Sequence, residues 1–300
     1  MMTKVGVEVN PLDVTTERDI RFIAGGMAKN GSQCEAYIYI CGIEPMREIS
    51  INDHITLMPV QPAANPDDMI DCYMKNGNGS EFEMGMLIST LRMVTAQLRI
   101  TADSPETLAI RTWNSQSICV QIGALLKCEV SWYFQSNDPA DKFNAKTQMS
   151  LICPNMYKFP SEMTIIDETR SIFLEKCLPV ALNLEHDDRY GNASNALWCY
   201  RMHYRPAIKM SVLWGGIESL FMIEKDIKKT LSVAASRFIC GDDSMVSEIK
   251  SLYKSRSKAV HEFKNAEKNI EEKSAELLHQ LIVACVERHC LPSVSRLLNP

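Results

Sequence analysis

The sequence has no apolar run long enough to cross a membrane. Its uninterrupted apolar stretches are short, as in Leu281–Val286, whereas a membrane-spanning helix needs about 20 such residues. The first residues, Met1–Asn10, contain no apolar core of the kind that marks a signal peptide. We therefore expect a soluble, cytoplasmic protein that has no membrane partner.

An excess of positive charge is also missing. The chain has 32 Lys and Arg residues against 37 Asp and Glu residues, which gives a formal net charge of -5. A protein that coats nucleic acid through bulk charge needs the opposite balance, because the phosphate backbone is anionic. Any nucleic-acid site in this chain must therefore be a local basic patch.

The 11 cysteines include no C-x-x-C pair. Most of them stand among apolar neighbours, as Cys119 and Cys285 do, where a thiol behaves as a small hydrophobic side chain. The nearest approach to a zinc-binding set is His279, Cys285, His289 and Cys290, whose spacing fits none of the usual structural zinc sites. We expect free thiols in a reducing compartment, with neither a metal nor a cofactor.

The first half of the chain mixes strand and helix signals. β-rich runs occur at Glu35–Cys41, Ile49–Val60 and Glu129–Phe134. A helix is expected to begin after Ser104, because a serine cap is followed by Pro105 and an acidic residue in the first turn. These signals predict an α+β domain.

After about Phe159 the strand-like alternation stops, and apolar residues recur at helical spacing through to Leu298. Prolines and glycines divide this half into helices, with a loop over 186–192 and a loosened turn at Gly215 and Gly216. The expected helices are Ile166–Leu178 (ended by Pro179), Ala193–His203, Pro206–Lys225, Ile227–Cys240, Ser244–Phe263 and Ala266–Cys290. The predicted fold class is therefore α+β, with a mixed domain at 1–160 followed by an all-helical domain at 161–300.

The most informative segment is Leu252–Glu262, with the sequence LYKSRSKAVHE. It places Arg256 and His261 in the one local basic stretch of an acidic chain, since no acid occurs between Ile249 and Val260. A histidine can exchange a proton with a ribose 2′-hydroxyl or a leaving 5′-oxygen, and an arginine can bind the phosphate. Three lysines are candidates for attracting the RNA backbone: Lys250, Lys254 and Lys258.

The spacing of this pair limits how it can act. Residues five apart on an ideal helix lie about 140° apart around the axis. Either the helix distorts near His261, or two copies of the helix meet across a two-fold axis and assemble the site together. The simpler alternative is that Arg256 is a solvated surface residue and His261 a surface or core histidine.

The segment resembles the signature of HEPN domains, in particular their ApeA-like branch, in which a Tyr-x-x-Arg-Ser-x-x-x-His run lies late in a helical bundle. The upstream stretches NALWCYRMHY and LWGGIESLF resemble the second and third helices of that branch, and KKTLSVAASRFICG resembles the next. The resemblance covers Met163–Leu298. Within it, Tyr253 and Ser257 belong to the motif, and Glu218 lies inside the apolar third helix.

The resemblance implies a helical, usually dimeric domain that is a metal-independent endoribonuclease in many members, with a role in antiviral defence or toxin-like growth arrest. Arg256 and His261 match the catalytic pair of the family. Ser257 stands where active members often have Asn, Asp or His, and Glu262 where Gly is frequent. The alternative is a non-catalytic module that binds RNA or protein or dimerises. Glu218 is expected either to be buried with a cation partner or to orient Arg256.

The N-terminal domain contains no catalytic constellation. His54 lies in a strand-like run without a nucleophile motif nearby, and the acidic residues stand mostly in helix-capping positions. By elimination, we assign 1–160 to sensing, substrate positioning or the binding of a trigger or partner protein. The expected partner of 161–300 is RNA, either tRNA or mRNA, with a second copy of the chain.

Overall fold

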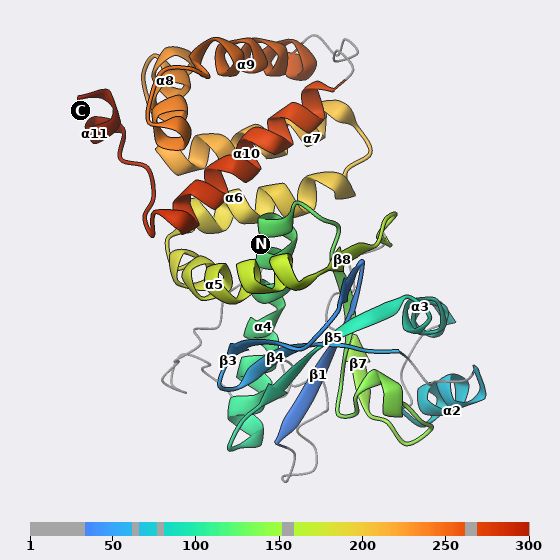
Figure 1. Cartoon of the computed structure of the whole chain (residues 1–300). Helices are drawn as coiled ribbons and strands as arrows, with labels where there is room; N and C mark the ends of the chain where they lie inside the picture. The colour runs from blue at the N-terminus through green and yellow to red at the C-terminus, as the bar shows by residue number, and fades with distance from the viewer. Residues whose placement is uncertain (1–33, 62–65, 77–80, 152–158, 262–268, 300) are drawn as a thin grey trace. The chain divides into compact units, whose positions relative to one another are not determined.

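The computed structural model describes residues 34–61, 66–76, 81–151, 159–261 and 269–299 (Figure 1). The chain divides into two compact units. The N-terminal unit consists of Met1–Cys119 with Glu129–Glu175, and the helical unit of Val120–Cys128 with Lys176–Pro300. Every strand that the structure describes lies in the N-terminal unit. The predicted α+β class is confirmed.

The N-terminal unit is built on a six-stranded antiparallel sheet. The predicted runs form strands because they are rich in β-branched and aromatic residues. The run at 49–60 folds as a hairpin of two strands. In their order across the sheet, the strands are β3 (Ile49–Asn52), β4 (Ile55–Pro59), β5 (Val94–Thr101), β1 (Glu35–Cys41), β6 (Ser131–Ser136) and β7 (Met149–Leu151).

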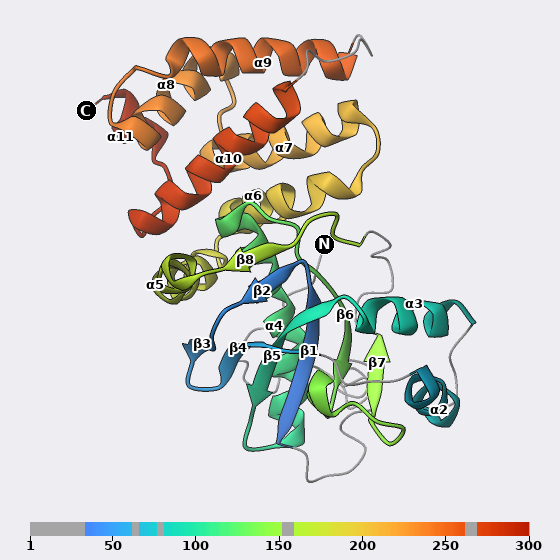
Figure 2. The same cartoon turned by 45° about the vertical axis from the view of Figure 1, so that its right-hand side comes forward.

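The long helix α4 (Pro105–Leu126) packs on this sheet (Figures 1 and 2). Its start is confirmed in detail, since the Ser104 hydroxyl accepts a hydrogen bond from the Thr107 backbone N–H at 3.2 Å. The indole Nε1 of Trp132 on β6 donates to Gln116 Oε1 on α4 at 3.0 Å, and both side chains are buried. Shorter helices complete the unit: α2 (Pro66–Asn76), α3 (Glu81–Leu91) and η2 (Ala140–Lys142).

A second, two-stranded sheet pairs β2 (Ile43–Pro45) with β8 (Thr164–Ile166) in parallel (Figure 2). We call this pair the β2–β8 ribbon. Gly42 turns the chain from β1 into β2 with a φ of +93°, and a Cβ atom there would collide with the Glu129 carbonyl. Only glycine suits that position.

The helical unit contains the last turns of α4, the second part of α5 and all later helices. Its core is formed by apolar side chains of α6, α7 and α10, among them the fully buried Leu213, Ile217 and Leu281. Among the described residues, no helix combines the length and the apolar character needed to cross a membrane. The helices are α5 (Glu168–Leu184), α6 (Asp188–Cys199), η3 (Tyr200–Met202), α7 (Pro206–Phe221), α8 (Ile227–Cys240), α9 (Val246–His261), α10 (Ile270–Glu287) and α11 (Val294–Leu298).

Three local expectations in this half are wrong. Helix α5 continues through Pro179 to Leu184 instead of ending at the proline. Helix α6 begins at Asp188, because Asp187 caps it by accepting from the Arg189 N–H, so most of the loop expected over 186–192 is helical. Helix α7 is continuous through its two glycines.

Gly216 explains why those glycines do not loosen α7. A Cβ atom at Gly216 would lie 2.6 Å from Ala196 Cβ on α6 and 3.1 Å from Leu278 Cδ2 on α10. The missing side chain therefore lets three helices approach closely. Gly215 faces the other way and would meet nothing within 4 Å.

Candidate functional site

Helix α9 contains every residue of the predicted site except Glu218. The structure describes the side chains of Lys250, Tyr253, Lys254 and Arg256. Those of Ser257, Lys258 and His261 lie outside the described residues, although the α9 backbone continues through position 261. The described part of α9 is therefore assigned as helix up to position 261.

Arg256 meets Glu218, which projects from α7. The guanidinium Nη1 lies 3.5 Å from Glu218 Oε1, and both side chains are partly exposed. This contact fits both expectations for Glu218, because the cation that Glu218 meets is Arg256 itself.

Tyr253 supports Arg256 from its own helix. The Arg256 guanidinium carbon lies 5.4 Å from the centroid of the Tyr253 ring, one turn earlier on α9. Burial raises the pKa of the Tyr253 hydroxyl, and the neighbouring Glu218 carboxylate raises it further, while Arg256 opposes the shift. The Tyr253 hydroxyl is therefore neutral at physiological pH, and the Arg256 guanidinium packs against an uncharged ring.

Trp214 fixes Tyr253 in turn. The two rings meet edge to face, with centroids 5.2 Å apart and an interplanar angle of 87°. The Trp214 indole is fully buried and donates from Nε1 to Ser274 Oγ on α10 at 3.2 Å. Helices α7, α9 and α10 therefore form the support on which Arg256 rests.

The Arg256–Glu218 pair is close but poorly aligned. Arg256 Nε and Glu218 Oε1 are both buried, and neither atom makes a hydrogen bond. An ion pair without aligned hydrogen bonds recovers little of the cost of removing its charges from water. The guanidinium is therefore held near the surface with part of its hydrogen-bonding capacity unused.

The lysines do not share the face of Arg256. Lys250 and Lys254 stand one turn apart on α9; Lys250 is half-buried and Lys254 is exposed. On an ideal helix, position 261 lies between these two lysines, and Arg256 lies about 140° away from it. The structure thus brings Arg256, Tyr253 and Glu218 together, and it leaves the lysine face separate.

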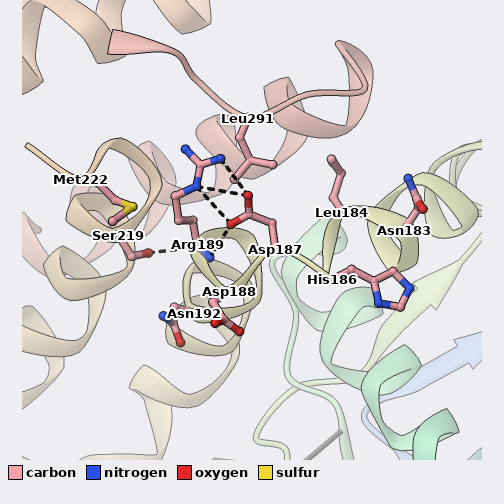
Figure 3. A pocket seen from close by; sticks show the side chains of 10 residues that line it. All are labelled: Asn183, Leu184, His186, Asp187, Asp188, Arg189, Asn192, Ser219, Met222 and Leu291. Carbon is pink, nitrogen blue, oxygen red and sulfur yellow. Dashed lines mark hydrogen bonds and ion pairs between the residues drawn. The ribbon is translucent and has the colours of Figure 1, made fainter. Parts of the chain in front are cut away.

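A pocket of about 840 Å³ lies elsewhere in the helical unit, at the turn from α5 into α6 (Figure 3). At its centre, Arg189 Nη2 lies 2.8 Å from Asp187 Oδ2. Apolar and polar side chains surround this pair. The pocket is lined by Asn183, Leu184, His186, Asp187, Asp188, Arg189, Asn192, Ser219, Met222 and Leu291.

The electrostatics of this pocket are set by its own ion pair. The Arg189 guanidinium lowers the pKa of the Asp187 carboxyl, and Asp187 raises that of Arg189. The pocket was not expected from the sequence, because residues 186–192 were predicted to form a loop. The signal available was Asp187 directly before a helix, a common N-cap.

No family model matches the chain, and the searches of curated proteins and of solved structures also found no match. Among the described residues, no cluster of three or more His, Cys, Asp or Glu side chains has the arrangement of a metal site. The function must therefore be inferred from the chemistry of α9 and from the resemblance of its motif.

Proposed function

We propose that this protein is a cytoplasmic, metal-independent endoribonuclease of the HEPN type, acting as a homodimer with Arg256 and His261 as its catalytic pair. The observation that carries the proposal is the placement of Arg256. Its side chain is partly exposed, and it is supported by Glu218 and by the ring of Tyr253. Antiviral defence or toxin-like growth arrest is the biological setting that the motif implies.

The reaction follows from the chemistry of the two side chains. His261 removes the proton from a ribose 2′-hydroxyl, whose oxygen attacks the adjacent phosphorus, and a histidine protonates the departing 5′-oxygen. Arg256 binds the non-bridging phosphate oxygens, on which negative charge increases in the transition state. The products are a 2′,3′-cyclic phosphate and a 5′-hydroxyl. Because the attacking group is the 2′-hydroxyl, DNA is not a substrate.

The dimer is part of the proposal because positions 256 and 261 point about 140° apart around the axis of one regular helix. Side chains at these two positions of a single copy therefore do not face the same phosphate. If two copies of α9 meet across a two-fold axis, the lysine face of one copy, which includes position 261, can approach Arg256 of the other. Lys250, Lys254 and Lys258 would then hold the RNA backbone.

The experiment is incubation of the full chain with total RNA and with tRNA in EDTA, followed by gel analysis and mapping of the cut ends. We expect discrete cuts with 2′,3′-cyclic phosphate ends, lost in both His261→Ala and Arg256→Ala. The matched controls are His203→Ala and Arg288→Ala. Arg288 has a comparable cation–π contact, at 5.2 Å from the Phe238 ring. Cleavage that persists in either site variant would remove that residue from the mechanism.

The second candidate is a non-catalytic binding module. It is favoured by the Glu218 contact, because Arg256 already has an anionic partner within the chain. Such a module would bind RNA with an affinity that falls steeply with salt, and would not cleave it. If the RNA stays intact in the EDTA experiment and its binding is salt-sensitive, the protein is a non-catalytic binding module.

A further inference from the structure

The β2–β8 ribbon of the N-terminal unit has one buried and one exposed face. Successive side chains of a strand point to opposite faces. Ile43 and Pro45 on β2 and Ile166 on β8 are buried. These three residues fix which face of the ribbon is directed into the unit.

The opposite face is mostly apolar. Met163 just before β8 is 46% exposed, Ile165 on β8 is 52% exposed, and Met46 just after β2 is 70% exposed. The Met46 N–H donates to the Ile166 carbonyl at 3.0 Å, so Met46 continues the ladder and its alternation. Glu44 is exposed and stands directly opposite Ile165 in the pairing. Three large apolar side chains therefore share this face with the carboxylate of Glu44.

The outer edge of β8 is open to a further strand. Among the described residues, β8 pairs with β2 alone. Its Ile165 carbonyl accepts from the exposed Arg170 side chain at 2.6 Å. A strand N–H can take the place of that arginine, since an unpaired strand edge is a template for an extended segment.

The charges around the ribbon indicate which kind of extended segment can bind to its exposed face. Glu44 lies on the face itself, and Glu162 is exposed next to Met163. Arg47, two residues after the end of β2, is already bound to Glu168 and Glu175, with nitrogen–oxygen distances of 2.9 and 2.6 Å. A second cation, the exposed Arg170, lies on the Ile165 carbonyl. The exposed carboxylates of Glu44 and Glu162 outnumber this one cation, and a second copy would bring two acidic surfaces together.

We propose that the exposed face of the β2–β8 ribbon binds an extended segment of a partner protein, in which apolar and basic residues alternate. The segment pairs along the outer edge of β8. Its apolar side chains cover Met163 and Ile165, and a basic side chain reaches Glu44. This surface does not depend on ribonuclease activity, and it gives the N-terminal unit a partner of defined chemistry.

The test uses the full chain and a fluorescein-labelled octapeptide of alternating lysine and valine, with binding followed by fluorescence anisotropy. We expect Ile165→Lys and Glu44→Lys each to weaken binding about tenfold, through lost contact and through charge repulsion. The matched controls are Ile70→Lys on α2 and Asp53→Lys in the β3–β4 turn, because both residues are exposed. Figures 1 and 2 show α2 far from β8 within the same unit.

Several results would overturn the proposal. One is equal binding by Ile165→Lys and the unaltered chain, and another is equal binding of an octapeptide of alternating glutamate and valine. Self-association that Ile165→Lys abolishes, measured by sedimentation equilibrium, would identify a second copy as the occupant instead. All four substitutions are on exposed residues, and circular dichroism of each variant verifies the fold.

Discussion

Arg256 on α9 and Glu218 on α7 lie 3.5 Å apart although 37 residues separate them in the chain. The same unit provides a closely comparable ion pair, Lys209 on α7 with Glu271 on α10, at 2.8 Å and with similar exposure. The second pair makes a well-formed hydrogen bond, whereas the first leaves buried atoms of both partners without one. This contrast indicates that the Arg256 pair is not optimised for stability alone.

The first prediction concerns Glu218→Gln. The substitution keeps the shape of the side chain but removes the charge that orients Arg256, so we expect kcat for RNA cleavage to fall about tenfold with KM little changed. The loss of folding free energy is expected to stay within about 1 kcal/mol, because the pair is partly exposed. Steady-state kinetics and urea unfolding measure the two effects.

Glu271→Gln is the control for this prediction. It breaks the comparable pair with Lys209, and we expect a similar change in stability without a change in kcat. If both variants lower kcat equally, Glu218 has no specific role in positioning Arg256.

The second prediction separates a site shared between two copies from a site within one copy. If Arg256 of one copy works with His261 of the other, a mixed dimer of Arg256→Ala and His261→Ala chains has one intact combination and one that lacks both residues. Random exchange of subunits should then restore about one quarter of the wild-type activity from two inactive proteins. If the pair acts within a single chain, the mixture stays inactive. Cleavage of tRNA before and after mixing measures the outcome.

Features that depend on neighbouring residues could be read from the sequence. The cap at Ser104 needs only the backbone N–H three residues later, and the strands at 35–41 and 131–136 follow from their own apolar and aromatic content. Helix α9 was expected on its periodicity and contains the whole motif.

Features that depend on distant partners could not be read in this way. Strand β8 has three residues, and its partner β2 lies about 120 positions earlier. Pro179 stays within α5 because residues on both sides of it are held in the core, among them Leu178 and Ala181. The sequence allowed two roles for Glu218, and only the crossing of α7 and α9 gives it Arg256 as its neighbour.

The third prediction is a pH dependence of stability at the pocket. Arg189 lowers the pKa of Asp187 below its ordinary value of 3.8, so the folded state binds this proton less readily than the unfolded state. The resulting stabilisation is complete above about pH 5, and it is lost as the pH falls through the lowered pKa. Asp187→Asn keeps a good N-cap but removes the ion pair. We expect its Tm to lie below that of the wild type at pH 7, and the difference to shrink as the pH falls below 3.8 and then through the lowered pKa of Asp187. If the difference in Tm between the two proteins stays constant as the pH is lowered, the Asp187–Arg189 pair makes no pH-dependent contribution to stability.

The fourth prediction compares two adjacent glycines on α7. Gly216→Ala places a methyl group 2.6 Å from Ala196 Cβ, so α6 and α7 must separate, and we expect a loss of about 1–3 kcal/mol in unfolding free energy. Gly215→Ala meets nothing within 4 Å on an exposed helical surface and removes backbone freedom from the unfolded chain, so it should stabilise by about 0.5–1 kcal/mol. Adding Ala196→Gly to Gly216→Ala should recover part of the loss, because it vacates the space that the new methyl group needs. Urea unfolding of the four proteins gives these values. If both glycine substitutions stabilise the protein, close packing of α6 against α7 is not what requires glycine at position 216.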